Sequence, residues 1–186
     1  MTELILIAHN LRSAHNIGSL LRTAEGLGVG KMWLSGYSPY PLAKTYLAGK
    51  TDSVSRDDDR LPHLAQKIDK QIAKTALGAE NTLAWEHQDE IADLLKELKQ
   101  AGYLVVALEQ APNAVKLPDF RLPDSPVEPA LPAKLALIVG REVEGIEPEI
   151  MAMCDQILEI PMFGRKESFN VVQAAAMALY HLRFVA

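Results

Sequence analysis

Short apolar runs alternate with stretches of helical periodicity along the chain, and this alternation limits the fold more than any other feature of the sequence. Runs of this length are typical of buried strands, and helical patterns between them are typical of crossovers between parallel strands. The pattern therefore predicts an α/β fold with a mostly parallel sheet and helices on both faces. The expected strands are residues 4–8, 31–34, 82–85, 103–108, 135–139 and 157–160.

Two segments between these strands have the spacing of amphipathic helices. Residues 15–29, HNIGSLLRTAEGLGV, repeat apolar side chains every three or four positions, and Asn16 is the expected N-cap. Residues 88–101 show the same spacing and end at Gly102. We expect the apolar face of the first helix to pack on the sheet.

Two further helices are expected nearer the C-terminus. Pro148 suits the first turn of a short helix over residues 147–153. Residues 170–185 predict an Ala- and Leu-rich helix that is apolar around much of its surface, with Ser168 or Asn170 as its N-cap. A helix that is apolar on all sides must be buried, either inside the molecule or between two subunits.

Length and composition are typical of one globular domain over residues 1–186. The net charge of −5 argues against broad attraction to nucleic acid, so any RNA contact must be local. No membrane span is expected, the first residues lack signal-peptide features, and a single cysteine fits a cytoplasmic location. Residues 35–60 and the Pro-rich residues 110–133 are expected to be irregular, the second as a long loop.

Two loops at expected strand ends are candidates for a ligand site. The sequence GREVEGI begins at Gly140, directly after the apolar run LALIV, and PMFGRKESFN follows the strand expected at 157–160. Open α/β sheets bind ligands beyond the carboxyl ends of their strands, where a glycine lets a ligand approach the backbone. The first loop alone is equally well explained as a simple turn. The convergence of both loops at one sheet edge favours a shared site.

Several polar residues near these loops have more than one interpretation. The aliphatic part of Arg22 can pack on apolar surface while its guanidinium stays in water. Alternatively, the guanidinium forms an ion pair with Glu142 or binds a phosphate through its planar donors. Ser168 and Asn170 are helix caps by default, which is compatible with positioning a ligand. The five histidines show no metal-ligand spacing and Cys154 has no partner cysteine, so no catalytic metal is expected.

Three ordered motifs resemble those of the SpoU (TrmH-like) family of RNA 2′-O-ribose methyltransferases, and the resemblance covers nearly the whole chain. The matching residues are Asn16, Gly18 and Arg22-Thr23-Ala24, then Gly140, Glu142 and Gly145, then Ile160-Pro161-Met162, Gly164, Ser168 and Asn170. The resemblance implies a SPOUT fold with a C-terminal deep trefoil knot, which the general rule against threaded connections would not suggest. It also implies a homodimer and S-adenosyl-L-methionine as cofactor for methyl transfer to a ribose 2′-hydroxyl of tRNA or rRNA.

The same resemblance implies roles for individual residues. The implied catalytic set is Arg22, Asn16, Glu142, Ser168 and Asn170. The implied cofactor-binding set is Leu108, Glu109, Gly140, Ile160, Met162, Ser168 and Phe169. Phe169 stands where family members commonly have leucine, which keeps an apolar contact and alters the shape of the pocket.

The role of Arg22 has two interpretations. A guanidinium is effectively always protonated, so we expect Arg22 to hold a phosphate and stabilise the developing alkoxide; the alternative is a general base. About fifteen residues precede the first motif, so we expect the catalytic domain itself to bind the RNA. Two alternative functions are a noncatalytic knotted RNA-binding or ribosome-assembly protein and a generic α/β enzyme acting on a small molecule.

Overall fold

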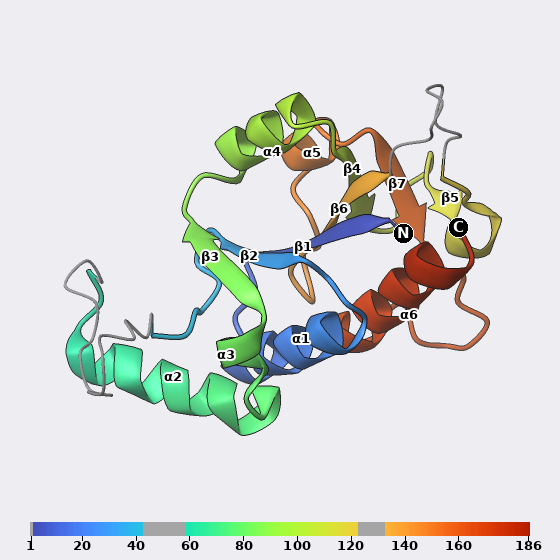
Figure 1. The fold of residues 1–186 in the computed structure, drawn as a ribbon. Helices are drawn as coiled ribbons and strands as arrows, with labels where there is room; N and C mark the ends of the chain where they lie inside the picture. The colour runs from blue at the N-terminus through green and yellow to red at the C-terminus, as the bar shows by residue number, and fades with distance from the viewer. Residues whose placement is uncertain (1, 43–58, 123–132) are drawn as a thin grey trace.

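The computed structural model describes residues 2–42, 59–122 and 133–186. Its centre is a seven-stranded sheet in the order β3-β2-β1-β6-β4-β7-β5, and the strand pairings are parallel. Figure 1 shows this sheet crossing the middle of the molecule. The strands are β1 Glu3–His9, β2 Lys31–Ser35, β3 Ala84–Gln88, β4 Leu104–Leu108, β5 Val115–Lys116, β6 Lys134–Val139 and β7 Gln156–Glu159.

Helices cover both faces of the sheet, so the predicted α/β arrangement is confirmed. On one face α1 lies beside α6, with α2 and α3 packed against α1, while α4 and α5 cover the opposite face (Figure 1). The helices are α1 Ala14–Gly26, α2 Pro62–Ala76, α3 Ala79–Thr82, α4 Ile91–Gln100, α5 Pro148–Met151 and α6 Val171–Phe184, with a 3₁₀ turn at Leu117–Asp119. Within the described ranges, none of them is long and apolar enough to cross a membrane.

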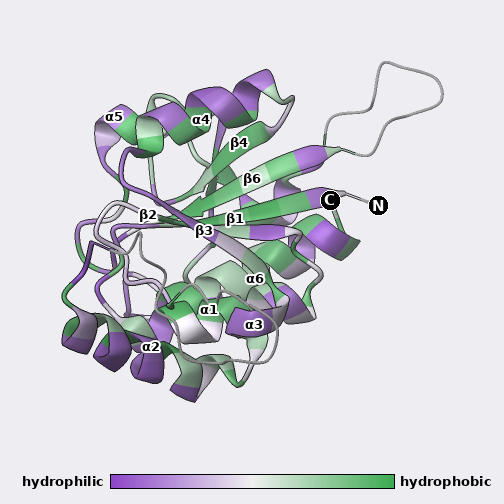
Figure 2. Cartoon of the chain, turned by 60° about the vertical axis from the view of Figure 1, so that its left-hand side comes forward, coloured by the Kyte–Doolittle hydropathy of each residue, from purple (hydrophilic) through white to green (hydrophobic). Residues whose placement is uncertain are grey.

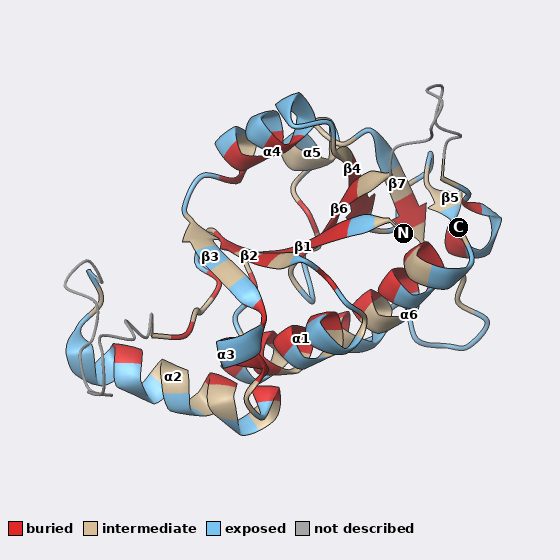
Figure 3. Ribbon diagram, in the orientation of Figure 1, coloured by how far each residue is buried: buried red, intermediate tan, exposed pale blue. Residues whose placement is uncertain are grey.

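The sheet separates two apolar layers of the core. In β1, Leu4 and Leu6 belong to the layer beneath α1 and α6, whereas Ile5 and Ile7 belong to the layer beneath α4. Successive side chains of a strand point to opposite faces, so a strand covered on both sides must be apolar throughout. This explains why the central strands appear in the sequence as continuous apolar runs. Figure 2 colours these strands as hydrophobic and Figure 3 as buried.

Several predicted boundaries are wrong. Ser13 is the N-cap of α1, because its Oγ accepts a hydrogen bond of 3.2 Å from the backbone N–H of Asn16, the residue expected as the cap. The strand expected at 82–85 is shifted to Ala84–Gln88, because Thr82 belongs to α3. The helix expected from residue 88 begins later, at Ile91, because Gln88 is the last residue of β3.

Two regions contain elements that the sequence did not predict. The fifteen-residue helix α2 was missed because its buried face consists largely of small or widely spaced residues, Ala65, Ile72 and Ala76. Within the stretch expected as a long loop, β5 pairs with β7 and is followed by the 3₁₀ turn. Within the two stretches expected to be irregular, residues 43–58 and 123–132 lie outside the described residues.

The N-cap of the last helix, α6, is one of the two residues predicted for it. Asn170 is its N-cap, because the side-chain Oδ1 accepts a hydrogen bond of 2.9 Å from the backbone N–H of Val172. Of the two ways in which this helix was expected to be buried, burial wholly inside the molecule is not observed, and burial between two subunits remains a prediction. One face of α6 is buried in the core, whereas Met177, Tyr180 and Phe184 are exposed.

Candidate functional site

A cavity of about 230 Å³ opens at the carboxyl ends of β4, β6 and β7, which are neighbours in the sheet. The loops that follow β6 and β7 both line it, as expected from their places at strand ends. The first residues of α6 close another side, through Val171 and Ala174. The cavity therefore combines three chain segments that are distant in sequence.

The lining of this cavity is apolar at some positions and acidic at others. Apolar side chains include Leu108, Ile160, Met162 and Phe169. Four carboxylate residues, Glu109, Glu142, Glu159 and Glu167, face a single basic lining residue, Arg141. All residues of the expected cofactor-binding set line the cavity: Leu108, Glu109, Gly140, Ile160, Met162, Ser168 and Phe169.

Glu109 anchors the loop after β6 by a hydrogen bond. Its Oε2 accepts a hydrogen bond of 3.0 Å from the backbone N–H of Ile146, and its Oε1 accepts one of 2.9 Å from Gln110. Gly145 has a φ of +70°, and a Cβ there would overlap the Glu109 carboxylate. The positive φ favours glycine at this position, and any larger residue would also displace the Glu109 carboxylate.

Gly140 is also explained by contacts within the loop. A Cβ at this position would lie 2.9 Å from the backbone nitrogen of Ile146 and 3.0 Å from the carbonyl carbon of Gly145. Ile146 is buried, so the loop has little room to shift. The interpretation from sequence, that the missing side chain makes room for a ligand, is therefore incomplete, because packing inside the protein already requires glycine here.

Two residues of the expected catalytic set contact each other at the rim of the cavity. Asn16 Nδ2, on the first turn of α1, donates a hydrogen bond of 2.8 Å to Glu142 Oε1 in the loop after β6. Ser168 lines the cavity, and Asn170 caps α6 directly beyond it. The three motifs are thereby brought together around one opening.

Arg22 stands apart from this group. It is exposed on α1 and is not among the residues that line the cavity. Glu142 bonds Asn16 instead, and in the described part of the chain the Arg22 side chain has no hydrogen bond or ion pair. The proposed ion pair between Arg22 and Glu142 is therefore not formed, and the guanidinium is available to a ligand.

Comparison with known proteins identifies the family. The SpoU rRNA Methylase family matches residues 60–180, which include the loops after β6 and β7. The chain belongs to the SpoU rRNA Methylase family. This result confirms the predicted family, and the second and third motifs lie within the matched residues.

Individual SpoU relatives are similar along almost the whole chain. A 23S rRNA (guanosine-2′-O-)-methyltransferase of Neisseria meningitidis is 28% identical over 180 residues, covering 97% of this chain and 58% of the relative. A tRNA (guanosine(18)-2′-O)-methyltransferase of Aquifex aeolicus is also 28% identical, covering 96% of this chain and 67% of the relative. The chain thus spans a little over half of the first relative.

The fold is shared with solved SpoU structures. The AdoMet-bound rRNA methyltransferase from Sinorhizobium meliloti superposes with a TM-score of 0.70 at 18% sequence identity, covering 96% of this chain and 54% of that one. At this level of identity the likeness concerns the fold, a parallel sheet flanked by helices.

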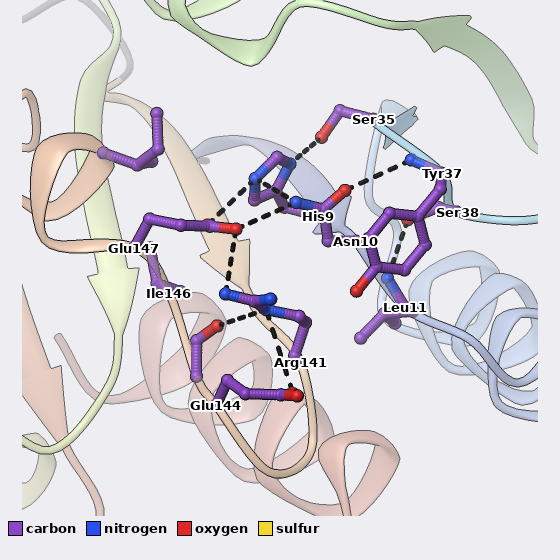
Figure 4. Close-up of polar contacts among 12 residues, drawn as sticks. His9, Asn10, Leu11, Ser35, Tyr37, Ser38, Arg141, Glu144, Ile146 and Glu147 are labelled. Carbon is purple, nitrogen blue, oxygen red and sulfur yellow. Dashed lines mark hydrogen bonds and ion pairs between the residues drawn. The ribbon is translucent and has the colours of Figure 1, made fainter.

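This SpoU chain also contains a polar network that the sequence did not reveal. The buried His9 Nδ1 lies 2.9 Å from Ser35 Oγ, and Asn10 Nδ2 lies 3.0 Å from both His9 Nε2 and Glu147 Oε1 (Figure 4). Arg141 Nη2 completes the network, 3.1 Å from Glu147 Oε1. The network ties the end of β1 to the loop that carries Glu142. No feature of the sequence indicated a role for His9. Its partner Ser35 lies opposite it only because of the register between β1 and β2.

Burial controls the protonation of this network. Burial lowers the pKa of His9, against an opposing effect of Glu147. The neutral ring then donates from Nδ1 to Ser35 and accepts at Nε2 from Asn10, which satisfies both nitrogens. His9 Nε2 also lies 3.1 Å from Glu147 Oε2. Glu147 Oε2 accepts no hydrogen bond of good geometry. We therefore assign the hydrogen bond at His9 Nε2 to the Asn10 amide. Burial alone would raise the pKa of Glu147, but hydrogen bonds and the Arg141 charge lower it.

Metal and thiol chemistry have little support in the described residues. Across residues 2–42, 59–122 and 133–186, no three His, Cys, Asp or Glu side chains gather in a group able to hold a metal ion. Burial raises the pKa of the Cys154 thiol to about 11, so the thiol stays protonated at neutral pH. Cys154 donates its hydrogen to the carbonyl oxygen of Ile150, which is a structural contact.

Proposed function

We propose that this protein transfers a methyl group from S-adenosyl-L-methionine to a ribose 2′-hydroxyl of tRNA or rRNA in the cytoplasm. The observation that carries the proposal is the cavity at three strand ends, around which the residues of all three SpoU motifs meet. Relatives named as 2′-O-methyltransferases of 23S rRNA and tRNA support the same reaction. The direct test is transfer of a radiolabelled methyl group to bulk RNA. Cofactor binding without any transfer would favour a noncatalytic RNA-binding protein.

The cavity suits the chemistry of this cofactor. S-adenosylmethionine carries a positively charged sulfonium, which supplies the methyl group, together with an ammonium group and a carboxylate, so its net charge is positive. The excess of carboxylates over the single Arg141 in the lining favours a cation. Leu108, Ile160 and Phe169 offer an apolar surface to the planar adenine.

The chain's own residues position the ribose and stabilise its oxygen. Glu142 fixes the Asn16 side chain at the cavity rim by the 2.8 Å hydrogen bond, which orients the first motif toward the cavity. Arg22 holds a phosphate of the substrate and stabilises the 2′-oxygen as it loses its proton. The proton leaves late, to solvent, to a phosphate oxygen or to Glu142.

Filling the cavity from α6 should weaken cofactor binding. Ala174 lines the cavity, so Ala174→Leu places a larger apolar side chain inside it. We expect calorimetry to show an affinity for S-adenosylmethionine at least about tenfold lower, which corresponds to about 1.4 kcal/mol. Ala176→Leu is the matched control, because Ala176 lies two residues further on the same helix and is not a lining residue. Equal affinities in the two variants would argue against this cavity as the cofactor site.

We also infer a homodimer from the exposed face of α6. Met177, Tyr180 and Phe184 follow one another at helical spacing on this face, and the rings of Tyr180 and Phe184 pack with centroids 4.9 Å apart. Phe163 and Val143, in the loops at the cavity, are almost fully exposed. Apolar side chains gathered in this way are typical of a surface that a partner covers.

The dimer predicts a clear result in sedimentation. The wild-type protein should sediment as a dimer at micromolar concentration, and Tyr180→Asp should shift it toward monomer because a charge would be buried without a partner. Tyr37→Asp, a change at another exposed tyrosine, serves as the control. A wild-type monomer would refute this proposal.

Finally, we infer that the C-terminal third forms a deep trefoil knot in a single domain over residues 1–186. Two strands support this proposal, because β6 lies between β1 and β4, and β7 lies between β4 and β5. The chain therefore returns twice to a position in the sheet between two earlier strands. The shared fold with solved SpoU structures agrees with this path.

A further inference from the structure

Three lysines form a straight stripe along the outer face of α2. Lys67, Lys70 and Lys74 are spaced by three and four residues, so they lie on one side of the helix, and His63 continues the line by one turn. All four side chains are exposed. Figure 2 shows α2 as largely hydrophilic, on the outside of the helical layer. We call Lys67, Lys70 and Lys74 the α2 lysine stripe.

No carboxylate of the described residues neutralises the α2 lysine stripe. Some lysines elsewhere are paired with carboxylates, as in the contacts of Lys31 with Glu86 at 2.6 Å and Lys99 with Asp155 at 2.7 Å. The one acidic residue within α2, Asp69, uses its Oδ1 to accept a hydrogen bond of 2.9 Å from the backbone N–H of Leu42. Like charges at this spacing repel one another, so the stripe is unfavourable unless an anion binds it. It is also a local exception in a chain whose net charge is −5.

The stripe lines a shallow groove that extends from α2 to α1, the helix that carries the first SpoU motif. The groove is lined by the stripe together with His15, His63, Gln66 and Gln71. His15 comes from α1, where its carbonyl oxygen accepts a hydrogen bond of 2.8 Å from Thr75 Oγ1 of α2. The next residue is Asn16, which bonds Glu142 at the cavity rim. The groove therefore ends beside the first SpoU motif.

We propose that the α2 lysine stripe binds the phosphate backbone of the substrate RNA and directs the strand toward the cavity. The identity of the ligand as RNA rests on the proposed function. Lys67 to Lys74 extends over about 11 Å at about 1.5 Å per residue, enough for more than one phosphate. Lysine acts as a point charge on phosphate, and amides such as Gln66 and Gln71 also donate to backbone oxygens. The stripe positions RNA without reading its sequence.

Salt-dependent RNA binding tests this proposal. Fluorescence anisotropy with labelled bulk tRNA should compare the wild type with the triple variant Lys67→Gln/Lys70→Gln/Lys74→Gln. We expect the triple variant to bind about tenfold more weakly or worse at low salt, with a slope of log affinity against log salt reduced by about 2 to 3. The single variant Lys70→Gln should reduce the slope by about 0.7 to 0.9.

The matched control changes lysines that lie away from the groove. Lys96→Gln/Lys116→Gln should leave both affinity and slope unchanged, because these residues are on α4 and β5. The triple variant should still bind S-adenosylmethionine as the wild type does, because none of its substitutions lines the cavity. That result also shows that the variant is folded.

The outcomes separate this proposal from the proposed function. Three results would each overturn RNA binding by the α2 lysine stripe. The triple variant could bind RNA with the affinity and salt slope of the wild type, or the wild type could bind no RNA. Polyglutamate could also displace the stripe from RNA as well as RNA itself does. A different result would support the stripe and refute the methyltransferase. In that case the triple variant loses RNA binding, and the wild type neither binds S-adenosylmethionine nor transfers a methyl group.

Discussion

Arg22→Ala should lower the rate of methyl transfer by about two orders of magnitude or more, comparable to the loss of one oxyanion donor. Affinity for S-adenosylmethionine should barely change, because Arg22 does not line the cavity. The fold should also be unaffected, since the side chain is exposed and makes no hydrogen bond or ion pair within the described residues. Single-turnover rates on a confirmed RNA substrate measure the effect.

A lysine at the same position separates the two roles proposed for Arg22. Arg22→Lys keeps the charge but loses the planar pair of donors, so electrostatic stabilisation predicts partial activity. A general base predicts instead that activity rises steeply at high pH, where the lysine amine deprotonates. Arg121→Ala is a suitable control, because within the described residues Arg121 bonds backbone oxygens of Pro118 and Phe120 and does not line the cavity. Full activity in Arg22→Ala would eliminate both roles.

Gly18→Ala should destabilise the protein by about 3 kcal/mol, in spite of the usual preference of helices for alanine. Gly18 lies in α1 where the helix crosses α2, and a Cβ there would overlap the carbonyl oxygen of Ile72 and the hydroxyl of Thr75. The carbonyl belongs to the backbone of a packed helix, so it cannot turn away as a flexible side chain would. Urea unfolding monitored by circular dichroism measures the change.

The same helix contains a matched control for Gly18. A Cβ at Gly26 would meet nothing within 4 Å. Gly26→Ala should therefore leave stability unchanged or raise it by up to about 1 kcal/mol. If both variants were equally stable, the close approach of α1 and α2 would be wrong. The clash also gives the glycine of the first motif a packing role that does not depend on any ligand.

The central strands could be predicted from the sequence because they are buried on both faces. A run such as LALIV, in β6, is apolar at every position for this reason. By contrast, α2 has an apolar face too sparse to stand out, and β5 consists of two residues. Strand order could not be predicted either, because strands that follow one another are usually neighbours and here β6 is inserted beside β1.

The candidate site was predictable in part. The rule that ligands bind at strand ends, together with the family motifs, pointed to the residues that line the cavity. Pairwise contacts were beyond this reasoning, since Asn16 and Glu142 are brought together only by the packing of α1 and β6. The network around His9 depends in the same way on strand register, which the sequence of one strand does not contain.

The long-range pairing of β1 also sets the order in which the protein matures during synthesis. Residues 3–8 pair with residues 134–139, so one edge of β1 stays open until most of the chain has left the ribosome. Non-local pairing of this kind slows folding, and an open apolar edge invites association with other chains. The cavity is completed later still, because it needs β7 and the start of α6. The helices α1 and α2 leave the ribosome before these segments, so the α2 lysine stripe is synthesised before the cavity is complete.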